Sequence, residues 1–278
     1  MSDFNSELVT DNSSDHSAAL TVEQAIANLL QKQDLGLRYY AAWWLGRFRV
    51  RKPEVIDALL IALEDESDRA PDGGYPLRRN AARALGKLGD KRAVSPLIRC
   101  LEFPDFYVRE AAAQALEKLA DQSCIPALIK LLDGGVAAAQ LVPGKPHLVQ
   151  PYEAIIEALG SLGATEAIEL IEPFTQHDVA KVQYAAARAM YQLTGESVYG
   201  ERLSQALTGE DLQLRRSALM DLGAIGYLPA AEAIAETLAE NSMKLISLKG
   251  LLETDLQSNG ADLSPESIKI MKLMDSLL

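Results

Sequence analysis

Residues 77–90 read LRRNAARALGKLGD, and this pattern recurs along the chain. Apolar and alanine positions return every three or four residues and a glycine follows, which is typical of an amphipathic helix that ends in a turn. Three spacings between successive copies are 31, 31 and 32 residues, and the other two, 40 and 43, contain insertions. A helix-pair repeat of this period predicts an α-solenoid, in which each pair covers the apolar face of its neighbour. The copies begin at Leu37, Leu77, Val108, Pro151, Val182 and Leu214.

Each repeat continues into a second helix, as in AVSPLIRCLE (93–102) and CIPALIKLLD (124–133). A proline near each start fits a helix, because the first helical turn does not need that N–H group. No window alternates between apolar and polar residues for long enough to predict a sheet.

The two ends of the chain differ from the repeats, as the caps of a solenoid should. Residues 1–19 are rich in Ser, Asp and Asn, which predicts a disordered tail and not a secretory signal. We expect residues 20–278 to form one all-α solenoid domain of about six repeats with terminal capping helices. The expected end elements are a helix over 21–33 with a capping box at Thr21 and Gln24, a shortened first helix over 243–253, and a capping helix over 264–278 that begins at Ser264 and Pro265.

Two insertions interrupt the repeats, at residues 64–76 and 134–151. Both follow a second helix and precede a first helix, so we expect both to emerge on the same edge of the solenoid. Long loops in a compact solenoid are often functional, and the alternative is a tolerated excursion at the surface.

Composition excludes several classes of function. The chain carries a net charge of −12, with 39 acidic and 27 basic residues, which argues against a nucleic-acid binder. No apolar run approaches the 18 residues of a membrane span. The cysteines, Cys100 and Cys124, lie among apolar residues without metal-ligand spacing, so we expect two buried thiols in a reducing, cytoplasmic compartment.

Five of the chain's aromatic residues lie in LRYYAAWWLGRFRV (37–50). Comparison with the other repeats predicts that Leu45 and Phe48 belong to the core, because their equivalents are apolar. The equivalents of Tyr40 and Trp44 are mostly small, so we expect this pair to pack under the helix over 21–33.

Tyr39 and Trp43 occupy positions that are mostly polar or charged in the other repeats, and they are four residues apart on one helix face. An exposed aromatic pair there indicates a ligand or a partner, and the alternative is packing under the 64–76 insertion. The same positions of the next repeat hold Arg79 and Arg83. Aromatic rings beside guanidinium groups suit a flat conjugated ligand that carries carboxylates.

Motifs of familiar catalytic sites are absent: the sequence has no HExxH, GxSxG, Walker A or GxGxxG pattern. His147, inside the second insertion, is a candidate titratable group, with an ordinary loop histidine as the alternative. Glu110 and Glu153 lie at polar repeat positions, where we expect a solvated surface. No metal site is predicted.

The repeats resemble the HEAT-like repeats of the bilin lyases. LRRNAARALGKLGD is close to the general repeat pattern, and YYAAWWLGRFRV near the N-terminus is more specific to this family. From about residue 20 onward the chain is similar to the alpha (E-type) subunits of heterodimeric phycocyanobilin lyases. It has no NHCQGN-type stretch, which marks relatives that also isomerise the bilin.

The resemblance implies a subunit that acts with an F-type subunit and attaches phycocyanobilin to a cysteine of the phycocyanin alpha chain. Phycocyanobilin would then be the substrate, and no permanent cofactor is implied. An acid near the pyrrole nitrogens would raise its electrophilicity, and Glu110 and Glu153 are weak candidates for this acid. The expected bilin- or partner-binding residues are Tyr39, Trp43, Arg79, Arg83 and His147. The other hypothesis is a non-enzymatic HEAT-like adaptor that assembles protein complexes.

Overall fold

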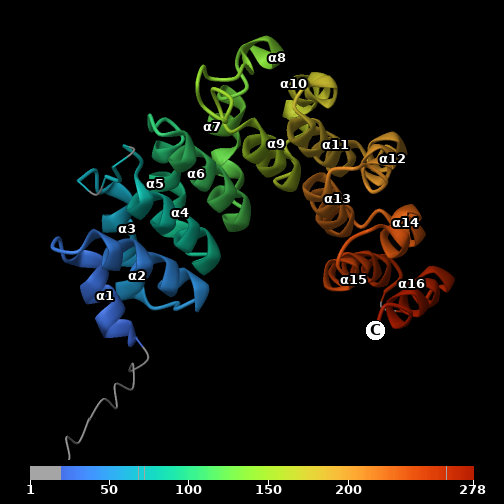
Figure 1. Ribbon diagram of the computed structural model, residues 1–278, viewed down its shortest axis with the longest axis horizontal. Helices are drawn as coiled ribbons and strands as arrows, with labels where there is room; N and C mark the ends of the chain where they lie inside the picture. Colours follow the sequence, from blue (N-terminus) through green and yellow to red (C-terminus); the bar gives the residue numbers. More distant parts are fainter. Residues whose placement is uncertain (1–19, 68, 72, 261) are drawn as a thin grey trace, which may run out of the picture.

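The computed structural model describes residues 20–67, 69–71, 73–260 and 262–278. The tail predicted over 1–19 lies outside the described residues. The described chain forms an arc of paired helices, and its β-type pairing is limited to an isolated bridge between Leu141 and Leu148 (Figure 1). The all-α solenoid predicted from the repeat is therefore confirmed.

The first helix of each repeat lies on the inner, concave side of the arc (Figure 1). Successive inner helices pack side by side, so that one polar face of each contributes to a continuous concave surface. These inner helices are α2 (Leu35–Arg47), α4 (Pro76–Leu88), α6 (Phe106–Leu119), α9 (Tyr152–Ser161), α11 (Ala180–Thr194), α13 (Leu212–Ile225) and α15 (Asn241–Ser258).

The second helices form the outer layer, and most are shorter than the inner ones. Four of them follow a single 3-10 turn, and α10 continues into another. The outer helices are α3 (Pro53–Glu64), α5 (Val94–Cys100), α7 (Ile125–Lys130), α10 (Ile168–Ile171), α12 (Ser197–Ala206), α14 (Ala231–Glu236) and α16 (Pro265–Asp275). The 3-10 turns are η1 (Lys91–Ala93), η2 (Gln122–Cys124), η3 (Thr165–Ala167), η4 (Glu172–Gln176) and η5 (Leu228–Ala230).

Both end elements exist, with one difference from the prediction. At the N-terminal end α1 (Val22–Leu30) begins with the predicted Thr21 and Gln24 capping box. At the C-terminal end the Ser264 hydroxyl accepts a hydrogen bond from the backbone of Ser267 and starts α16. The first helix expected to be shortened is instead 18 residues long, because the helix continues through TDLQS before it ends.

Glycine sets how closely most inner helices approach. Four inner helices have a glycine at the same position of the repeat. A Cβ atom added to any of these glycines would lie 2.6–2.8 Å from a Cα atom of the next inner helix, which leaves no room for a side chain. At the same repeat position α6 has Glu117 and α11 has Tyr191. The junctions of α6 with α9 and of α11 with α13 therefore lack this close contact. The four glycines are Gly46, Gly86, Gly160 and Gly223.

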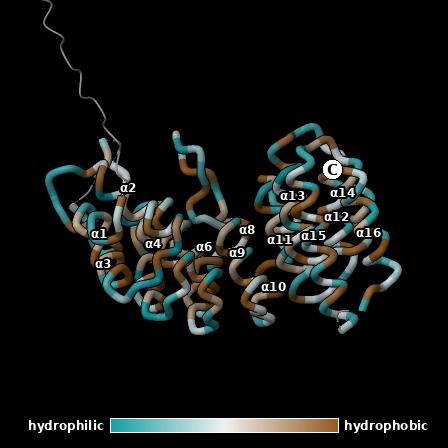
Figure 2. Tube along the Cα trace, turned by 90° about the horizontal axis from the view of Figure 1, so that it is seen from below, coloured by the Kyte–Doolittle hydropathy of each residue, from teal (hydrophilic) through white to brown (hydrophobic). Residues whose placement is uncertain are grey.

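Apolar residues run through the stacked helices from one end of the arc to the other (Figure 2). Leu45 is fully buried, as its repeat position predicts. The core prediction for Phe48 is wrong, because 62% of this residue is exposed. The helix α2 ends one residue earlier than α4 does in the repeat, and the Phe48 ring lies against Trp44 with centroids 4.9 Å apart.

The packing predicted for Tyr40 is also wrong, since 48% of it is exposed, whereas Trp44 is half-buried against the core. The helix α1 instead covers Arg38, which is 2% exposed. Its Nε donates to the Leu29 carbonyl at 3.1 Å and its Nη2 to Asp65 at 2.6 Å. The buried guanidinium of Arg38, and not the predicted ring of Tyr40, therefore holds α1 against the solenoid.

Cys100 and Cys124 are free and buried, as predicted. Burial raises the pKa of each thiol to about 11. No helix among the described residues is long and apolar enough to cross a membrane.

Candidate functional site

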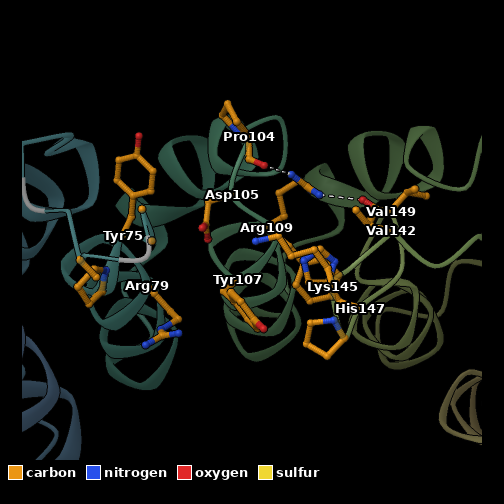
Figure 3. A pocket seen from close by; sticks show the side chains of 16 residues that line it. Tyr75, Arg79, Pro104, Asp105, Tyr107, Arg109, Val142, Lys145, His147 and Val149 are labelled. Atoms are coloured by element: carbon orange, nitrogen blue, oxygen red, sulfur yellow. Dashed lines mark hydrogen bonds between the residues drawn. The ribbon is translucent and has the colours of Figure 1, made fainter.

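The two insertions lie on the same edge of the solenoid, which confirms the prediction. Together with the start of α6 they enclose a hollow of about 530 Å³ (Figure 3). The first insertion contributes Tyr75 and the second contributes Lys145 and His147. From the inner helices, Arg79 of α4 and Tyr107 of α6 line the floor. The hollow is therefore aromatic and cationic.

Arg109 holds the second insertion in place. Its Nη1 donates to the carbonyls of Phe103 and Pro104, both at 2.8 Å. Its Nη2 donates to the carbonyl of Val149 at 2.9 Å, and Figure 3 shows the bonds to Pro104 and Val149. One guanidinium thus joins the insertion to the turn that precedes α6, and it does so with three backbone acceptors.

His177 holds the other end of the insertion. This histidine is 5% exposed, its Nδ1 accepts the Val179 N–H at 3.0 Å, and its Nε2 lies 3.1 Å from the Ala139 carbonyl. Because Nδ1 is the acceptor, the proton is on Nε2, which donates to the carbonyl. The insertion between Ala139 and Val149 is thus fixed at both ends.

His147 separates the large hollow from a smaller one of about 240 Å³. Its ring stacks on Phe106 with centroids 4.1 Å apart and meets Tyr107 edge-on at 5.8 Å. Its Nδ1 lies 2.8 Å from the Leu148 carbonyl and therefore carries the proton in the neutral ring. The Nε2 atom of neutral His147 is left as an acceptor.

Glu110, Glu153 and His147 all line the smaller hollow. The structure thus brings together the three weak catalytic candidates, which come from α6, α9 and the second insertion. The side chain of Glu110 is 28% exposed and lies 3.8 Å from Arg83. Burial raises the pKa of Glu110 above its ordinary value, Arg83 opposes this rise and Glu153 adds to it.

Arg79 lines the large hollow. Its guanidinium lies 5.8 Å from the Tyr107 ring centroid, and its buried Nε has no hydrogen-bond partner among the described residues. Arg83 lines neither hollow and is paired with Glu110.

Tyr39 and Trp43 do not line either hollow. They lie on α2, which packs against α4, and they are 38% and 45% exposed. The first insertion does not bury them, so the alternative of packing under that loop is wrong. Asn80 of α4 donates to the Tyr39 carbonyl at 3.1 Å and joins the two helices here.

Comparison with known proteins gives the family. The HEAT repeat family matches residues 70–140, and the PBS lyase HEAT-like repeat matches residues 37–65. The phycocyanobilin lyase subunit alpha of Nostoc sp. (strain PCC 7120) is 65% identical over 261 residues, which cover 93% of this chain and 94% of the relative. That of Microchaete diplosiphon is 70% identical over 265 residues, which cover 93% and 90%.

This chain belongs to the phycocyanobilin lyase alpha-subunit family. Among solved structures, the complex of CpcE and CpcF of phycocyanin lyase from Nostoc sp. PCC7120 contains a similar chain. It has 64% sequence identity and a TM-score of 0.88, and the match covers 99% of this chain and 100% of that one. The resemblance read from YYAAWWLGRFRV and the repeats is confirmed.

This lyase-family chain has a further polar cluster on its concave face, around Arg188 of α11. The guanidinium lies 3.3 Å from Glu117 of α6, 3.9 Å from Glu157 of α9 and 3.2 Å from Asp221 of α13. Three carboxylates thus share one cation, and Nε of Arg188 has no partner among the described residues.

The cluster shifts the ionisation of its acids. Burial is the largest cause of the rise in the pKa of Glu157 to about 8, and Arg188 opposes it while the neighbouring carboxylates add to it. The same balance raises the pKa of Asp221 to about 6. Sequence reasoning did not find this cluster. The available signal was the pattern of opposite charges at neighbouring inner-face positions in successive repeats.

Proposed function

We propose that this chain is the alpha subunit of a heterodimeric lyase that attaches phycocyanobilin to a cysteine of the phycocyanin alpha chain. The observation that carries the proposal is the full-length match to one chain of a solved two-chain phycocyanin lyase complex. The curated relatives that are 65% and 70% identical to this chain over the matched residues have the same subunit name.

The chemistry requires little from the lyase itself. Phycocyanobilin is an open-chain tetrapyrrole with two propionates and an electrophilic ethylidene group. The acceptor thiolate adds to the ethylidene carbon and forms the thioether, while the displaced electron pair takes up a proton from an acid. The lyase holds the bilin in one conformation and presents it to the correct thiol. Cys100 and Cys124 do not compete, because they are buried and their pKa values are raised.

Figure 3 shows the surface on which we place the bilin. The rings of Tyr107 and His147 offer flat faces for the pyrroles, and Arg79 and Lys145 offer cations for the propionates. Tyr39, Trp43 and Arg83 lie on neighbouring inner helices and extend the surface toward the bilin or the partner subunit.

Glu110 is the acid that we favour. It lines the smaller hollow beside His147, and its raised pKa keeps a larger fraction of the carboxyl protonated than at an exposed site. Protonating the bilin would increase the electrophilicity of the ethylidene carbon. Glu153 is close enough to contribute to this shift and is the second candidate.

The proposal includes an F-type subunit as the permanent partner and no resident cofactor. The concave surface would then be one half of the bilin site, with the remaining contacts supplied by the other chain. A cytoplasmic location fits two free buried thiols in a reducing compartment.

The test is co-expression of this chain with an F-type subunit, the phycocyanin alpha chain and a phycocyanobilin source. A covalent, fluorescent adduct is expected only when both subunits are present. Equal yield of the correct adduct without this chain would show that the proposal is wrong. An adaptor would instead bind protein partners without changing the absorbance spectrum of added phycocyanobilin.

A further inference from the structure

Charge is distributed unevenly along the solenoid. Residues 20–140 contain 17 basic and 16 acidic residues, whereas residues 141–278 contain 10 and 19. The net charge is therefore +1 over residues 20–140 and −9 over residues 141–278. A protein with this asymmetry presents one end on which an acidic partner is not repelled.

Four cations gather at the C-terminal ends of three neighbouring inner helices. Arg47 and Arg49 lie at the end of α2, Lys87 lies at the end of α4 and Lys118 at the end of α6. All four are exposed, and none forms an ion pair with another described residue. These residues are called the basic edge below.

The cations of the basic edge are close enough to repel one another. Burial lowers the pKa of Lys87 below its ordinary value, and the positive charges of Lys118, Arg47, Arg83 and Arg49 lower it further. Basic residues near a helix C-terminus are favoured by the helix dipole, but the last turns of α9, α11, α13 and α15 contain none. The dipole alone therefore does not explain the cluster.

Arg49 has a backbone conformation that disfavours an arginine. Its φ angle is 51°, in the left-handed region, where four later inner helices end on glycine. A side chain in this region brings strain that glycine avoids. Ala120, at the corresponding place after α6, has a similar φ angle of 50°, so two of the three helix ends at the basic edge carry this strain. The corresponding glycines are Gly89, Gly163, Gly195 and Gly226.

The basic edge also has an apolar contact point. Phe48 lies between Arg47 and Arg49 and is 62% exposed, with its ring resting on Trp44. An exposed aromatic residue with an unpaired cation on each side in the sequence is suited to a protein surface that combines carboxylates with one apolar side chain.

We propose that the basic edge docks an acidic surface of the acceptor protein during the lyase reaction. The inference rests on the proposed function, because only that reaction requires an acceptor. The acceptor must leave after each transfer, so its contact should be small, charged and reversible. A permanent subunit interface is larger and more apolar, which the four exposed cations do not match.

The test uses the complete heterodimer and the apo-phycocyanin alpha chain. Binding is measured by the fluorescence anisotropy of the labelled apo chain, and adduct formation is followed separately at saturating phycocyanobilin. For R47E/K87E we expect about tenfold weaker binding and a similar rise in KM for the acceptor at ~50 mM salt, with kcat unchanged. The difference should shrink at ~500 mM salt, where exposed charges are screened.

Two further variants control for folding and for total charge. Arg49→Gly relieves backbone strain, so it should weaken acceptor binding without lowering the unfolding temperature. K249E/K272E makes the same charge change at the far end of the solenoid and should bind the acceptor as the wild type does. Size-exclusion chromatography confirms that each variant retains the F-type subunit.

Acceptor binding by R47E/K87E that equals the wild type at low salt would overturn the docking proposal. Loss of the F-type subunit from that variant would also overturn it, because the basic edge would then be the subunit interface. Absence of any adduct with wild-type heterodimer would reject the proposed function alone, since the anisotropy measurement still decides the docking.

Discussion

The imidazole of His147 and the ring of Phe106 are stacked, with centroids 4.1 Å apart and planes 14° from parallel. Phe106 is the first residue of α6, and His147 comes from an insertion about forty residues further along the chain. The stack places the insertion over the start of the helix and divides the ligand space into two hollows. The two hollows at this edge are therefore formed by several repeats and the insertion together, and not by a single repeat.

Removing the ring of His147 should join the two hollows. A bilin pyrrole that stacks on the His147 ring would gain about 0.5–1.5 kcal/mol, so His147→Ala should weaken phycocyanobilin binding by roughly 2–10-fold. His147→Phe keeps the stack and loses Nε2. Absorbance titration of the heterodimer separates the two effects: equal affinity in the alanine variant and the wild type would contradict the role of the ring.

Glu110→Gln should slow ligation and leave bilin binding nearly unchanged. A positioned acid contributes roughly 10²–10⁴-fold, and the amide donates no proton. In the wild type the rate should fall as pH rises through the raised pKa of Glu110, because the protonated carboxyl is the active form. Glu153→Gln is the matched control. Single-turnover rates across pH would count against Glu110 if only the Glu153 variant lost this pH dependence.

Trp43 and Trp44 should respond differently to removal. Trp44 is half-buried against the core, so Trp44→Ala should lower the free energy of unfolding by about 2–3 kcal/mol, below the usual cost for a fully buried ring. Trp43 is 45% exposed, so Trp43→Ala should cost less than about 1 kcal/mol and should reduce bilin transfer. Urea denaturation and transfer assays check both, and equal stability losses would remove the distinction.

The Arg188 cluster should make stability depend on pH. The pKa of Glu157 is about 8 in the folded chain and near 4.5 when unfolded, so the folded state binds the extra proton between these values. Stability should therefore decline from about pH 5 to pH 8. Glu157→Gln removes the titrating group and should flatten this decline. A wild-type stability that is constant over this range in urea denaturation would refute the prediction.

Arg109 and His177 should control the order of the second insertion. Arg109→Lys keeps the charge but loses the fork that reaches three carbonyls, and His177→Ala loses the contact with Ala139. Both variants should show faster amide exchange and proteolysis between residues 139 and 149. Arg99→Lys, which alters an exposed ion pair on the outer layer, is the control. Unchanged exchange in both variants would mean that other contacts hold the insertion.

The repeat explains why the fold could be predicted while parts of the site could not. Periodicity reports helix faces, so the buried position of Leu45 and the common edge of the two insertions followed from spacing alone. Phe48 differed because α2 ends one residue early, and a helix end depends on local backbone conformation. Tyr40 differed because a buried arginine, Arg38, binds α1 through its backbone.

In the candidate site, too, repeat periodicity predicted some features and not others. Exposure of Tyr39 and Trp43 was predictable from the polar equivalents of these positions in other repeats. The stack of His147 on Phe106 was not, because it depends on the path of an insertion that has no equivalent elsewhere in the chain. The Arg188 cluster draws on three further helices, and repeat alignment alone does not give the distances between their side chains.

The glycine contacts join some neighbouring inner helices closely and leave two junctions without such a contact. Glu117 and Tyr191 stand where the other inner helices have glycine, so the arc should bend most readily between α6 and α9 and between α11 and α13. The smaller hollow spans the first of these joints. Arg188 reaches across both, to Glu117 on one side and Asp221 on the other, and acts as a brace. We therefore expect a change in the curvature of the arc at the first joint to change the shape of the smaller hollow.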